Sequence, residues 1–277
     1  MPELPEVETV VRGLAARMTH HRLARLDLHR GDLRWPFPRG LKAKAEGRTI
    51  EALSRRAKYI VIELDDGGVL LMHLGMSGRM MIFERGSNQP PEPHDHVVFT
   101  LDDGTSIRFN DPRRFGMLDY TERGALSRHK LLAGLGPEPL GPEFTGPGLY
   151  AALKGKRTPL KAALLDQQVV AGLGNIYVSE ALYHAGLSPK RLARTVTPER
   201  AERLVTAIQS VLQRAIAAGG SSLRDYVQAS GELGYFQHEW AVYGREGERC
   251  PGCDCKSSIR RIVQSGRSTF YCAKRQR

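Results

Sequence analysis

The chain begins "MPELPEVETV", which places Pro2 directly behind the initiator methionine. If Met1 is removed, Pro2 becomes the N-terminus and its nitrogen becomes a free secondary amine. An α-amino group titrates near pH ~7.7–8.0, against about 10.4 for lysine, so roughly a tenth of it is unprotonated at neutral pH. Such an amine is a poised nucleophile. The structural alternative is a proline that merely begins a fold.

The residues behind Pro2 predict a helix, and Pro2 itself lies before it. Pro5 suits a first helical position, and the acidic Glu3 and Glu6 favour the first turn. Apolar residues then recur on one helical face, at Val7, Val10, Val11 and Leu14. Glu6 fits the role of a helix-dipole carboxylate better than Glu3 does, so we interpret Glu6 as partly structural.

All four cysteines lie between positions 250 and 272, at Cys250, Cys253, Cys255 and Cys272. A disulfide framework would spread them along the chain, so the cluster predicts one metal site in a reducing compartment. "CPGC" is half of a zinc site, and tetrahedral Zn²⁺ needs further ligands. Arg275 stands where the partner of Cys272 in a CxxC pair would be, and Cys255 could fill that place. We expect one structural Zn²⁺ held by four thiolates. Because Cys253 and Cys255 would crowd the metal, a three-thiolate site is the alternative.

The tail is basic, with seven Lys or Arg and no acidic residue from 256 to 277. Within it, "SIRRIVQSGRSTFYC" interrupts the charges with apolar residues at strand-like spacing, and Ser265-Gly266 marks a turn. This pattern favours a two-stranded hairpin over a loose, solvated end. Such a hairpin could present Arg267 to a phosphate, which a guanidinium contacts through two hydrogen bonds.

Length and charge limit the class of protein. A chain of 277 residues is expected to form about two domains. Its 41 Lys and Arg against 30 Asp and Glu give a formal net charge of +11, which suggests a polyanionic partner. The N-terminus has no secretory pattern, and no apolar run approaches the ~18 residues of a membrane span. We therefore expect a cytoplasmic protein.

The pattern of apolar residues changes along the chain. Residues 20–120 read mostly as strands, and "HVVFTLDDGTSIRFND" predicts a hairpin that turns at Asp103-Gly104. The prolines and glycines of "GLGPEPLGPEFTGPG" (134–148) predict a linker without regular structure. Thr197 then suits the N-cap of a helix that ends at Gly219-Gly220, and a shorter helix is expected from about residue 222. The predicted apolar face of the long helix is Ala201, Leu204, Val205, Ile208, Val211, Leu212 and Ile216.

These patterns predict a β-rich domain (1–133), a linker (134–150), a helical domain (151–237) and a metal-binding tail (238–277).

Six segments together resemble the bacterial formamidopyrimidine-DNA glycosylases: "MPELPEVET", "RRAKYIVIEL", "HLGMSG", "NDPRRFG", "QQVVAGLGNIYVSEAL" and "GRSTFYC". They occur in order, from Met1 to the last residues of the chain. The resemblance implies an α+β fold with an N-terminal β-sandwich flanked by helices. A helix–two-turns–helix domain with a zinc-finger β-hairpin would follow. The activity implied is excision of oxidised purines from double-stranded DNA, followed by strand cleavage at the abasic site.

Four residues then acquire catalytic roles through the resemblance. Pro2 would attack the sugar C1′ and form an iminium, which acts as an electron sink for elimination. Glu3 would give and take protons during ring opening. Lys58 matches the lysine assigned as an acid in β-elimination. Arg267 matches the finger arginine that contacts phosphate and is assigned to δ-elimination.

The remaining matches concern DNA binding. Extraction of a base leaves a void, and apolar, aromatic or long cationic side chains commonly fill such gaps. Met76, Arg113 and Phe115 match the family's three inserted residues. "ASGELGYFQ" (229–237) resembles the loop that covers the extruded base. The expected contacts to DNA also include His94, Lys156, Lys161 and Asn175, the last in a glycine turn that admits an anion at a helix start.

The finger departs from the family pattern of two CxxC pairs separated by sixteen residues, because Arg275 replaces the last ligand. Two other functions remain alternatives. One is the sister group of similar fold that prefers oxidised pyrimidines, although "HLGMSG" and "DPRRFG" favour the purine side. The other is a non-catalytic binder of damaged DNA. We expect a monomer that binds double-stranded DNA containing oxidised bases or abasic sites.

Overall fold

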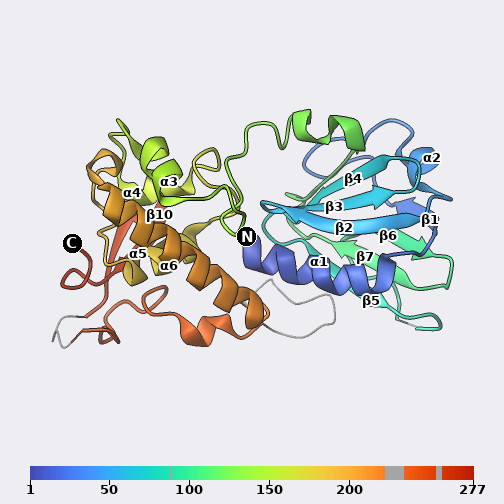
Figure 1. The fold of residues 1–277 in the computed structure, drawn as a ribbon. Coiled ribbons are helices and arrows are strands. Elements are labelled where there is room, and N and C mark those ends of the chain that lie inside the picture. Colours follow the sequence, from blue (N-terminus) through green and yellow to red (C-terminus); the bar gives the residue numbers. More distant parts are fainter. Residues whose placement is uncertain (88, 222–233, 254–257) are drawn as a thin grey trace. The chain divides into compact units, whose positions relative to one another are not determined.

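The computed structural model describes residues 1–87, 89–221, 234–253 and 258–277. These residues form two compact units. The first unit contains residues 1–133 and 218–237, and the second contains residues 134–217 and 238–277. Figure 1 shows the elements of both.

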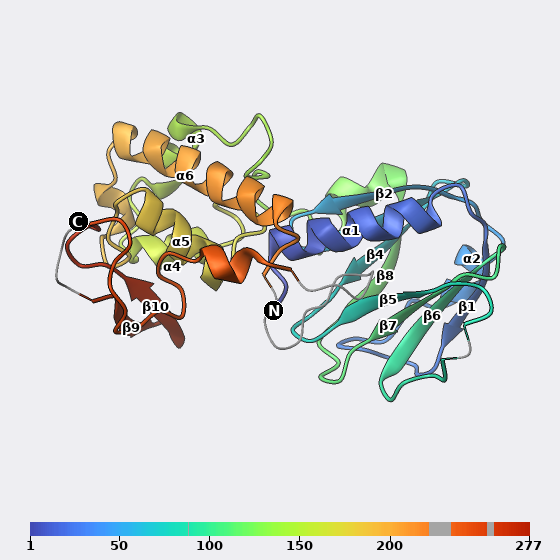
Figure 2. The same cartoon turned by 90° about the horizontal axis from the view of Figure 1, so that it is seen from below.

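The first unit is a β-sandwich with one long helix packed on it. Its two antiparallel sheets have the strand orders β1-β6-β7-β5 and β2-β3-β4-β8. Apolar side chains of both sheets and of α1 share one core, and Figure 2 shows α1 running along β2. The elements in chain order are α1 (Leu4–Met18), β1 (Leu23–Leu28), α2 (Leu41–Ala45), β2 (Ile50–Arg56), β3 (Tyr59–Leu64), β4 (Gly68–His73), β5 (Arg79–Phe83), β6 (Asp95–Leu101), β7 (Ser106–Asn110), β8 (Met117–Glu122) and η1 (Arg123–Arg128).

Local sequence explains the two elements of this unit that were predicted in most detail. The helix α1 begins with Pro5 in its first turn, and its buried residues include the whole predicted apolar face. The β6–β7 hairpin turns at Gly104, whose φ of +89° suits glycine. Beside it, the Asp103 carboxylate accepts the N–H of Thr105 at 2.8 Å and stabilises the turn. Both predictions are confirmed.

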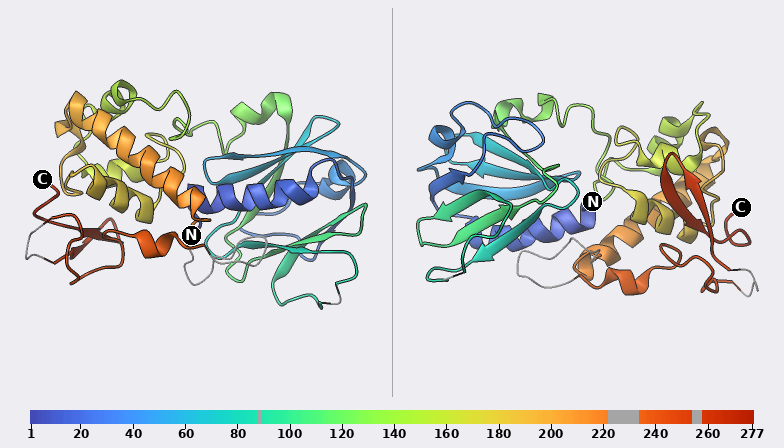
Figure 3. Two further views of the ribbon diagram at one scale, coloured as in Figure 1. Left: turned by 60° about the horizontal axis from the view of Figure 1, so that its bottom comes forward. Right: turned by 180° about the vertical axis from the view of Figure 1, so that it is seen from behind.

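The second unit consists of helices and a two-stranded hairpin. Its elements are α3 (Gly146–Leu153), α4 (Leu160–Leu165), α5 (Asn175–His184), η2 (Ala193–Thr195), α6 (Pro198–Ala217), β9 (Arg260–Gln264) and β10 (Arg267–Tyr271), while η3 (Phe236–Glu239) spans the boundary between the units. The helix α6 lies beside α3 and α5, and β10 packs on α5 (Figure 3). Ser265 and Gly266, with φ of +49° and +71°, form the predicted two-residue turn of the hairpin.

A buried carboxylate connects α5 to the segment that leads into the hairpin. Glu180 is 1% exposed, and its two oxygens accept the N–H groups of Ala241, Val242 and Tyr243 at 2.8–3.0 Å. Burial raises the pKa of Glu180, while these three hydrogen bonds act in the opposite direction. The contact positions the chain just before the cysteine cluster.

The structure differs from the sequence-based expectation in three places. The helix α3 begins at Gly146, inside the segment predicted to be irregular, because Thr145 caps it and Pro147 suits its first turn. Residues 218–221 and 234–237 belong to the first unit, although the sequence placed them in the helical domain. Ile216 is only half-buried at the end of α6. The shorter helix expected from about residue 222 lies outside the described residues.

Among the described residues, we find no helix with the length and hydrophobicity that a membrane crossing would require.

Candidate active site and nucleic-acid interface

The start of α1 carries the two residues with the strongest chemical signal. Pro2 lies directly before Glu3, the N-cap residue of α1, and both are buried. The N–H of Glu3 donates to Oε2 of Glu6 at 2.9 Å. Oε1 of Glu6 accepts the N–H of Ser221 at 2.8 Å. Glu6 therefore connects the backbone beside Pro2 to residue 221, in agreement with a structural role.

Residue 221 belongs to a short stem in which two backbone segments meet. The N–H of Tyr235 donates to the carbonyl of Ala218 at 3.0 Å, and the N–H of Phe236 donates to that of Gly220 at 3.1 Å. Residues 218–221 and 234–236 thus lie together, next to Glu6. Most of the loop predicted to cover an extruded base (229–237) lies outside the described residues, and only its last residues belong to this stem.

Lys58 occupies the tight turn between β2 and β3. Arg56 pairs with Tyr59 across the two strands, so Ala57 and Lys58 alone form the turn. Ala57 has a φ of +53°, as such two-residue turns require. Lys58 is only 7% exposed and is therefore not an ordinary surface lysine.

Arg55 fixes this turn to the helix that starts beside Pro2. Its Nη1 donates to the carbonyl of Ala57 at 3.0 Å, and its Nε donates to Glu8 in α1 at 3.0 Å. The side chain of Arg55 is 9% exposed, and a partly buried guanidinium with two acceptors holds both elements more firmly than a surface ion pair would. Arg55 thus connects the helix that starts beside Pro2 to the turn that contains Lys58.

His73 lies near Lys58, and its role could not be predicted from the sequence alone. It pairs with Tyr59 across β3 and β4, with their rings 5.0 Å apart. The N–H of Gly75 donates to Nδ1 of His73 at 2.9 Å, so the neutral ring carries its proton on Nε2. Burial, together with the charges of Lys58 and Arg34, lowers the pKa of His73 to about 4. The only signal in the sequence was its place at the start of "HLGMSG".

We predict that His73 makes the fold acid-sensitive. In the unfolded chain a histidine titrates near pH ~6.5, so between about pH 6.5 and 4 the unfolded state binds more protons and folding stability falls as pH falls. His73→Asn keeps an acceptor for the Gly75 N–H but cannot take the proton. Urea unfolding at several pH values should therefore show a smaller decline in the variant than in the wild type. Equal declines would contradict the assignment.

Three of the predicted DNA-contacting side chains project from two loops of the first unit. Met76 and Phe115 are 37% and 40% exposed, which is unusual for residues of their size in this chain. Arg113 is exposed as well, and its guanidinium carbon lies 5.1 Å from the centre of the Phe115 ring. His94 is exposed on a neighbouring turn with a φ of +75°.

In the second unit, one backbone carbonyl brings together residues from three elements. The carbonyl oxygen of Ser268 accepts hydrogen bonds from Nδ2 of Asn175 at 3.0 Å and from Nζ of Lys161 at 2.9 Å. Asn175 is the first residue of α5, and Ser268 directly follows the exposed Arg267 in β10. The "GLGN" turn and the finger arginine, which are distant in sequence, are therefore neighbours.

The two predicted lysines of this unit differ in their surroundings. Lys161 is 1% exposed, and its ammonium also donates to Oγ1 of Thr269 at 2.7 Å. Lys156 lies outside the core, with its side chain 38% exposed and its Nζ 3.6 Å from Asp166. Lys161 therefore holds β10 in place, and only Lys156 is accessible to a ligand from solvent.

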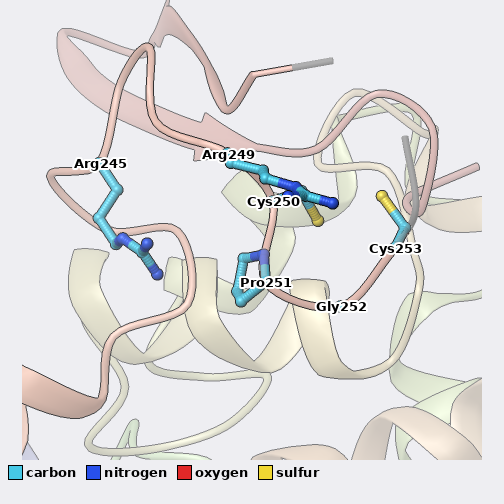
Figure 4. Close-up of a pocket in the computed structure, with 6 residues that line it drawn as sticks. All are labelled: Arg245, Arg249, Cys250, Pro251, Gly252 and Cys253. Carbon is cyan, nitrogen blue, oxygen red and sulfur yellow. The ribbon is translucent and has the colours of Figure 1, made fainter. Parts of the chain in front are cut away.

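The cysteine cluster is a candidate metal site within the described residues. The Sγ atoms of Cys250, Cys253 and Cys272 all lie within 4.8 Å of one another, and those of Cys253 and Cys272 are 3.7 Å apart. Figure 4 shows Cys250 and Cys253 in the pocket that they line. Cys250 and Cys272 are free thiols, whereas Cys253 is disulfide-bonded in this structure. With Cys253 reduced to a thiolate, the three sulfur atoms would fit three corners of a tetrahedral Zn²⁺ site. Cys255, the fourth predicted ligand, lies outside the described residues.

Arg275 supports this cluster without being a ligand. Its guanidinium donates to the carbonyl of Gly252 at 2.8 Å and to that of Tyr183 at 3.3 Å, and it lies 4.8 Å from the centre of the Tyr183 ring. The hydroxyl of Tyr183 in turn contacts Sγ of Cys250 at 3.4 Å. Arg275 thus connects the loop between two of the cysteines to α5, which explains how the finger tolerates an arginine at this position.

Comparison with known proteins agrees with this architecture. The family described as the formamidopyrimidine-DNA glycosylase N-terminal domain matches residues 1–118, and that described as the formamidopyrimidine-DNA glycosylase H2TH domain matches residues 135–227. The combination defines a two-unit DNA glycosylase with a helix–two-turns–helix module.

Relatives that match over the full length of the chain carry the same family name. The chain is 58% identical over 280 residues to the formamidopyrimidine-DNA glycosylase of Acidiphilium cryptum and 56% identical over 283 residues to that of a Ruegeria species, with 100% of each chain covered. Among solved structures, it resembles the MutM (Fpg) protein of Thermus thermophilus with a TM-score of 0.88 and 43% identity, covering 99% of this chain and 98% of the other. A complex of a Lactococcus lactis Fpg variant with a Fapy-dG containing DNA matches with the same TM-score, 34% identity and 99% coverage of both chains.

The chain belongs to the formamidopyrimidine-DNA glycosylase family. It is therefore a DNA glycosylase of base excision repair, in a family that combines glycosylase and abasic-site lyase activities.

Proposed function

We propose that the chain excises oxidised purines, such as 8-oxoguanine and formamidopyrimidines, through an imine formed at Pro2, and then cleaves the strand by β,δ-elimination. The observation that carries this proposal is the position of Pro2 directly before α1, with the adjacent Glu3 backbone held by Glu6. Pro2 is itself buried, and its ring restricts the backbone, which limits the positions that its nitrogen can take. The complex of a Lactococcus lactis relative with Fapy-dG containing DNA supports the substrate class.

The chemistry balances with groups of this chain. The Pro2 nitrogen bonds to C1′ while the glycosidic bond breaks, and the base leaves with the electron pair and is protonated by water. The N–H proton of Pro2 passes to the Glu3 carboxylate. Protonation of the sugar ring oxygen by Glu3 opens the ring and gives the iminium. Loss of a C2′ proton then expels the 3′ phosphate, and a second elimination expels the 5′ phosphate.

We assign phosphate binding during these steps to two cationic groups. In the first unit, the buried Lys58 lies with Arg34 near the neutral His73, whose Nε2–H is a donor. In the second unit, Arg267 and Asn175 flank Ser268, next to the N-terminus of α5, where the helix dipole favours an anion. Lys58 would serve as the acid in β-elimination and Arg267 would assist the δ step.

We further propose that the three-cysteine cluster holds one structural Zn²⁺, with Cys255 as the fourth ligand. The donor set is what supports this, because thiolates select zinc over hard cations. When bound, the ion would hold the hairpin β9–β10 to the loop at Cys250. Metal analysis of the untagged protein should give about one zinc per chain, and a metal-free protein with an intact hairpin would contradict it.

Borohydride trapping tests the proposed reaction. The probes are duplexes that carry 8-oxoguanine opposite cytosine, thymine glycol opposite adenine, or no lesion. We expect covalent trapping and strand cleavage with 8-oxoguanine in preference to thymine glycol. The reverse preference would place the enzyme with the oxidised-pyrimidine group, and binding without trapping or cleavage on any duplex would make it a non-catalytic binder.

We place the enzyme in the bacterial cytoplasm as a monomer. A dimeric mass in light scattering with DNA would contradict the monomeric state.

A further inference from the structure

Asp111 contacts each of the three segments of the first unit that carry side chains expected to bind DNA. These are the loop of Met76, the loop of Arg113 and Phe115, and the turn at His94. Asp111 is fully buried, although it belongs to the loop that carries Arg113 and Phe115. In the sequence, Asp111 and Pro112 form a residue pair that is typical of turns. The structure gives the carboxylate and the backbone of Asp111 separate partners.

The two carboxylate oxygens hold two different loops. Oδ1 accepts the hydroxyl proton of Ser77 at 2.6 Å, next to Met76. Oδ2 accepts the N–H of Gly116 at 2.7 Å, next to Phe115. Both bonds are short and charge-assisted, the class that fixes geometry most strongly.

Ser77 extends this connection to the arginine. Its Oγ accepts the N–H of Arg113 at 3.2 Å while its own proton goes to Asp111. The "HLGMSG" and "DPRRFG" loops are therefore joined in both directions. They also touch directly, because a Cβ added at Gly75, whose φ is +66°, would lie 2.6 Å from the carbonyl oxygen of Phe115. Any side chain at Gly75 would collide with the backbone of Phe115, so the two loops are in close contact at this point.

The backbone of Asp111 holds the third segment. Its N–H donates to the carbonyl of His94 at 3.1 Å. Its carbonyl lies 3.0 Å from Nε2 of His96, which must be the donor because a carbonyl only accepts. His94 is thereby attached to the same residue as the loops of Met76 and Phe115.

We infer that Asp111, acting through Ser77 and Gly116, is the positioning residue that makes Met76, Arg113 and Phe115 a single rigid wedge. This inference rests on the proposed function, in which these side chains fill the space left by an extruded base. Insertion of these side chains must overcome the stacking of the bases in the duplex. If the loops that carry them shifted during insertion, base extrusion would be slow. A fixed wedge requires no ordering when it meets DNA.

The test separates base extrusion from the later chemistry. Ser77→Ala removes one branch of the network and leaves the Gly116 branch intact, whereas Asp111→Ala removes both. Thr105→Val is the matched control, because Oγ1 of Thr105 likewise donates to a carboxylate, that of Asp103, at 2.9 Å, in the turn at the opposite end of β7 from Asp111. Thermal unfolding of each variant shows which of them are folded.

The readout is the fluorescence of 2-aminopurine placed beside 8-oxoguanine, which rises when the stack opens, measured together with single-turnover excision. We expect Ser77→Ala to lower the rates of both by about tenfold, as loss of one charge-assisted hydrogen bond allows. Cleavage of a preformed abasic site should fall far less, because no base has to be extruded. In Ser77→Ala, a duplex with no base opposite the 8-oxoguanine should restore much of the excision rate, because the lesion is then unpaired.

Three outcomes decide the inference. If Ser77→Ala and Asp111→Ala open the stack as fast as Thr105→Val does, Asp111 does not position the wedge. If excision and abasic cleavage fall in parallel, the residue is merely structural and the inference is wrong. If the wild type opens the stack but never excises 8-oxoguanine, the proposed reaction fails while the wedge inference is judged on the fluorescence alone; a wild type that does neither overturns both.

Discussion

Pro2→Gly is expected to abolish most borohydride trapping and to lower excision of 8-oxoguanine by at least on the order of a hundredfold. The variant keeps an N-terminal amine, but a primary one, whose imine loses its charge when it is deprotonated and so is a weaker electron sink than the permanently charged iminium of proline. Glycine also frees the backbone that the proline ring restricts, so the amine is less well oriented. Single-turnover kinetics and trapping on the same duplex measure both effects.

Pro5→Gly supplies the matched control for this prediction. It makes the same substitution three residues further on, in the first turn of the same helix, and leaves the N-terminal amine intact. We expect it to cost stability, because proline suits that position, while most of the trapping remains. Mass spectrometry of each protein must show that Met1 is absent. If Pro5→Gly lost trapping as fully as Pro2→Gly, the effect of Pro2 would be one of folding, and the nucleophile would have to be sought elsewhere.

The elements that depend on local sequence were predictable. The amphipathic α1, the Asp103-Gly104 turn and the Ser265-Gly266 turn each follow from a short pattern whose physical cause acts within a few residues. The family resemblance supplied the β-sandwich, which the local patterns alone did not give. The start of α3 was missed because the glycines and prolines around it outweighed the Thr145 cap.

The candidate site was predictable as a set of residues but not as a network. His73 acquires its position from pairing with Tyr59, and no local pattern sets the register of two strands. Asp111 looked like a turn residue because the partner of its Oδ1, Ser77, comes from a segment 34 residues away in sequence. In both cases the functional group was inside a motif already quoted, yet its contacts depend on tertiary structure.

Lys161 shows the same limit, and it leads to the second large effect. Sequence reasoning placed Lys161 and Lys156 together as lysines that contact DNA, but the ammonium of Lys161 is buried against Ser268 and Thr269. Lys161→Met retains most of the side-chain volume and removes the charge. We expect a loss of about 1.5–3 kcal/mol in the free energy of unfolding, the range for hydrogen bonds to a charged group. We also expect β10 to be displaced together with Arg267.

Lys156→Ala should behave in the opposite way. Its exposed ion pair with Asp166 contributes little to folding, so the free energy of unfolding should change by less than about 1 kcal/mol. If Lys156 contacts a phosphate, removing it lowers the slope of log K against log salt by about one, since each neutralised phosphate contributes about 0.9. Lys161→Met should instead weaken binding with a smaller change in slope, because its own charge does not reach solvent. If Lys161→Met lowered the slope by about one and Lys156→Ala left it unchanged, the ammonium of Lys161 would leave β10 to bind DNA. Its hydrogen bond to the carbonyl of Ser268 would then be present only in the free enzyme.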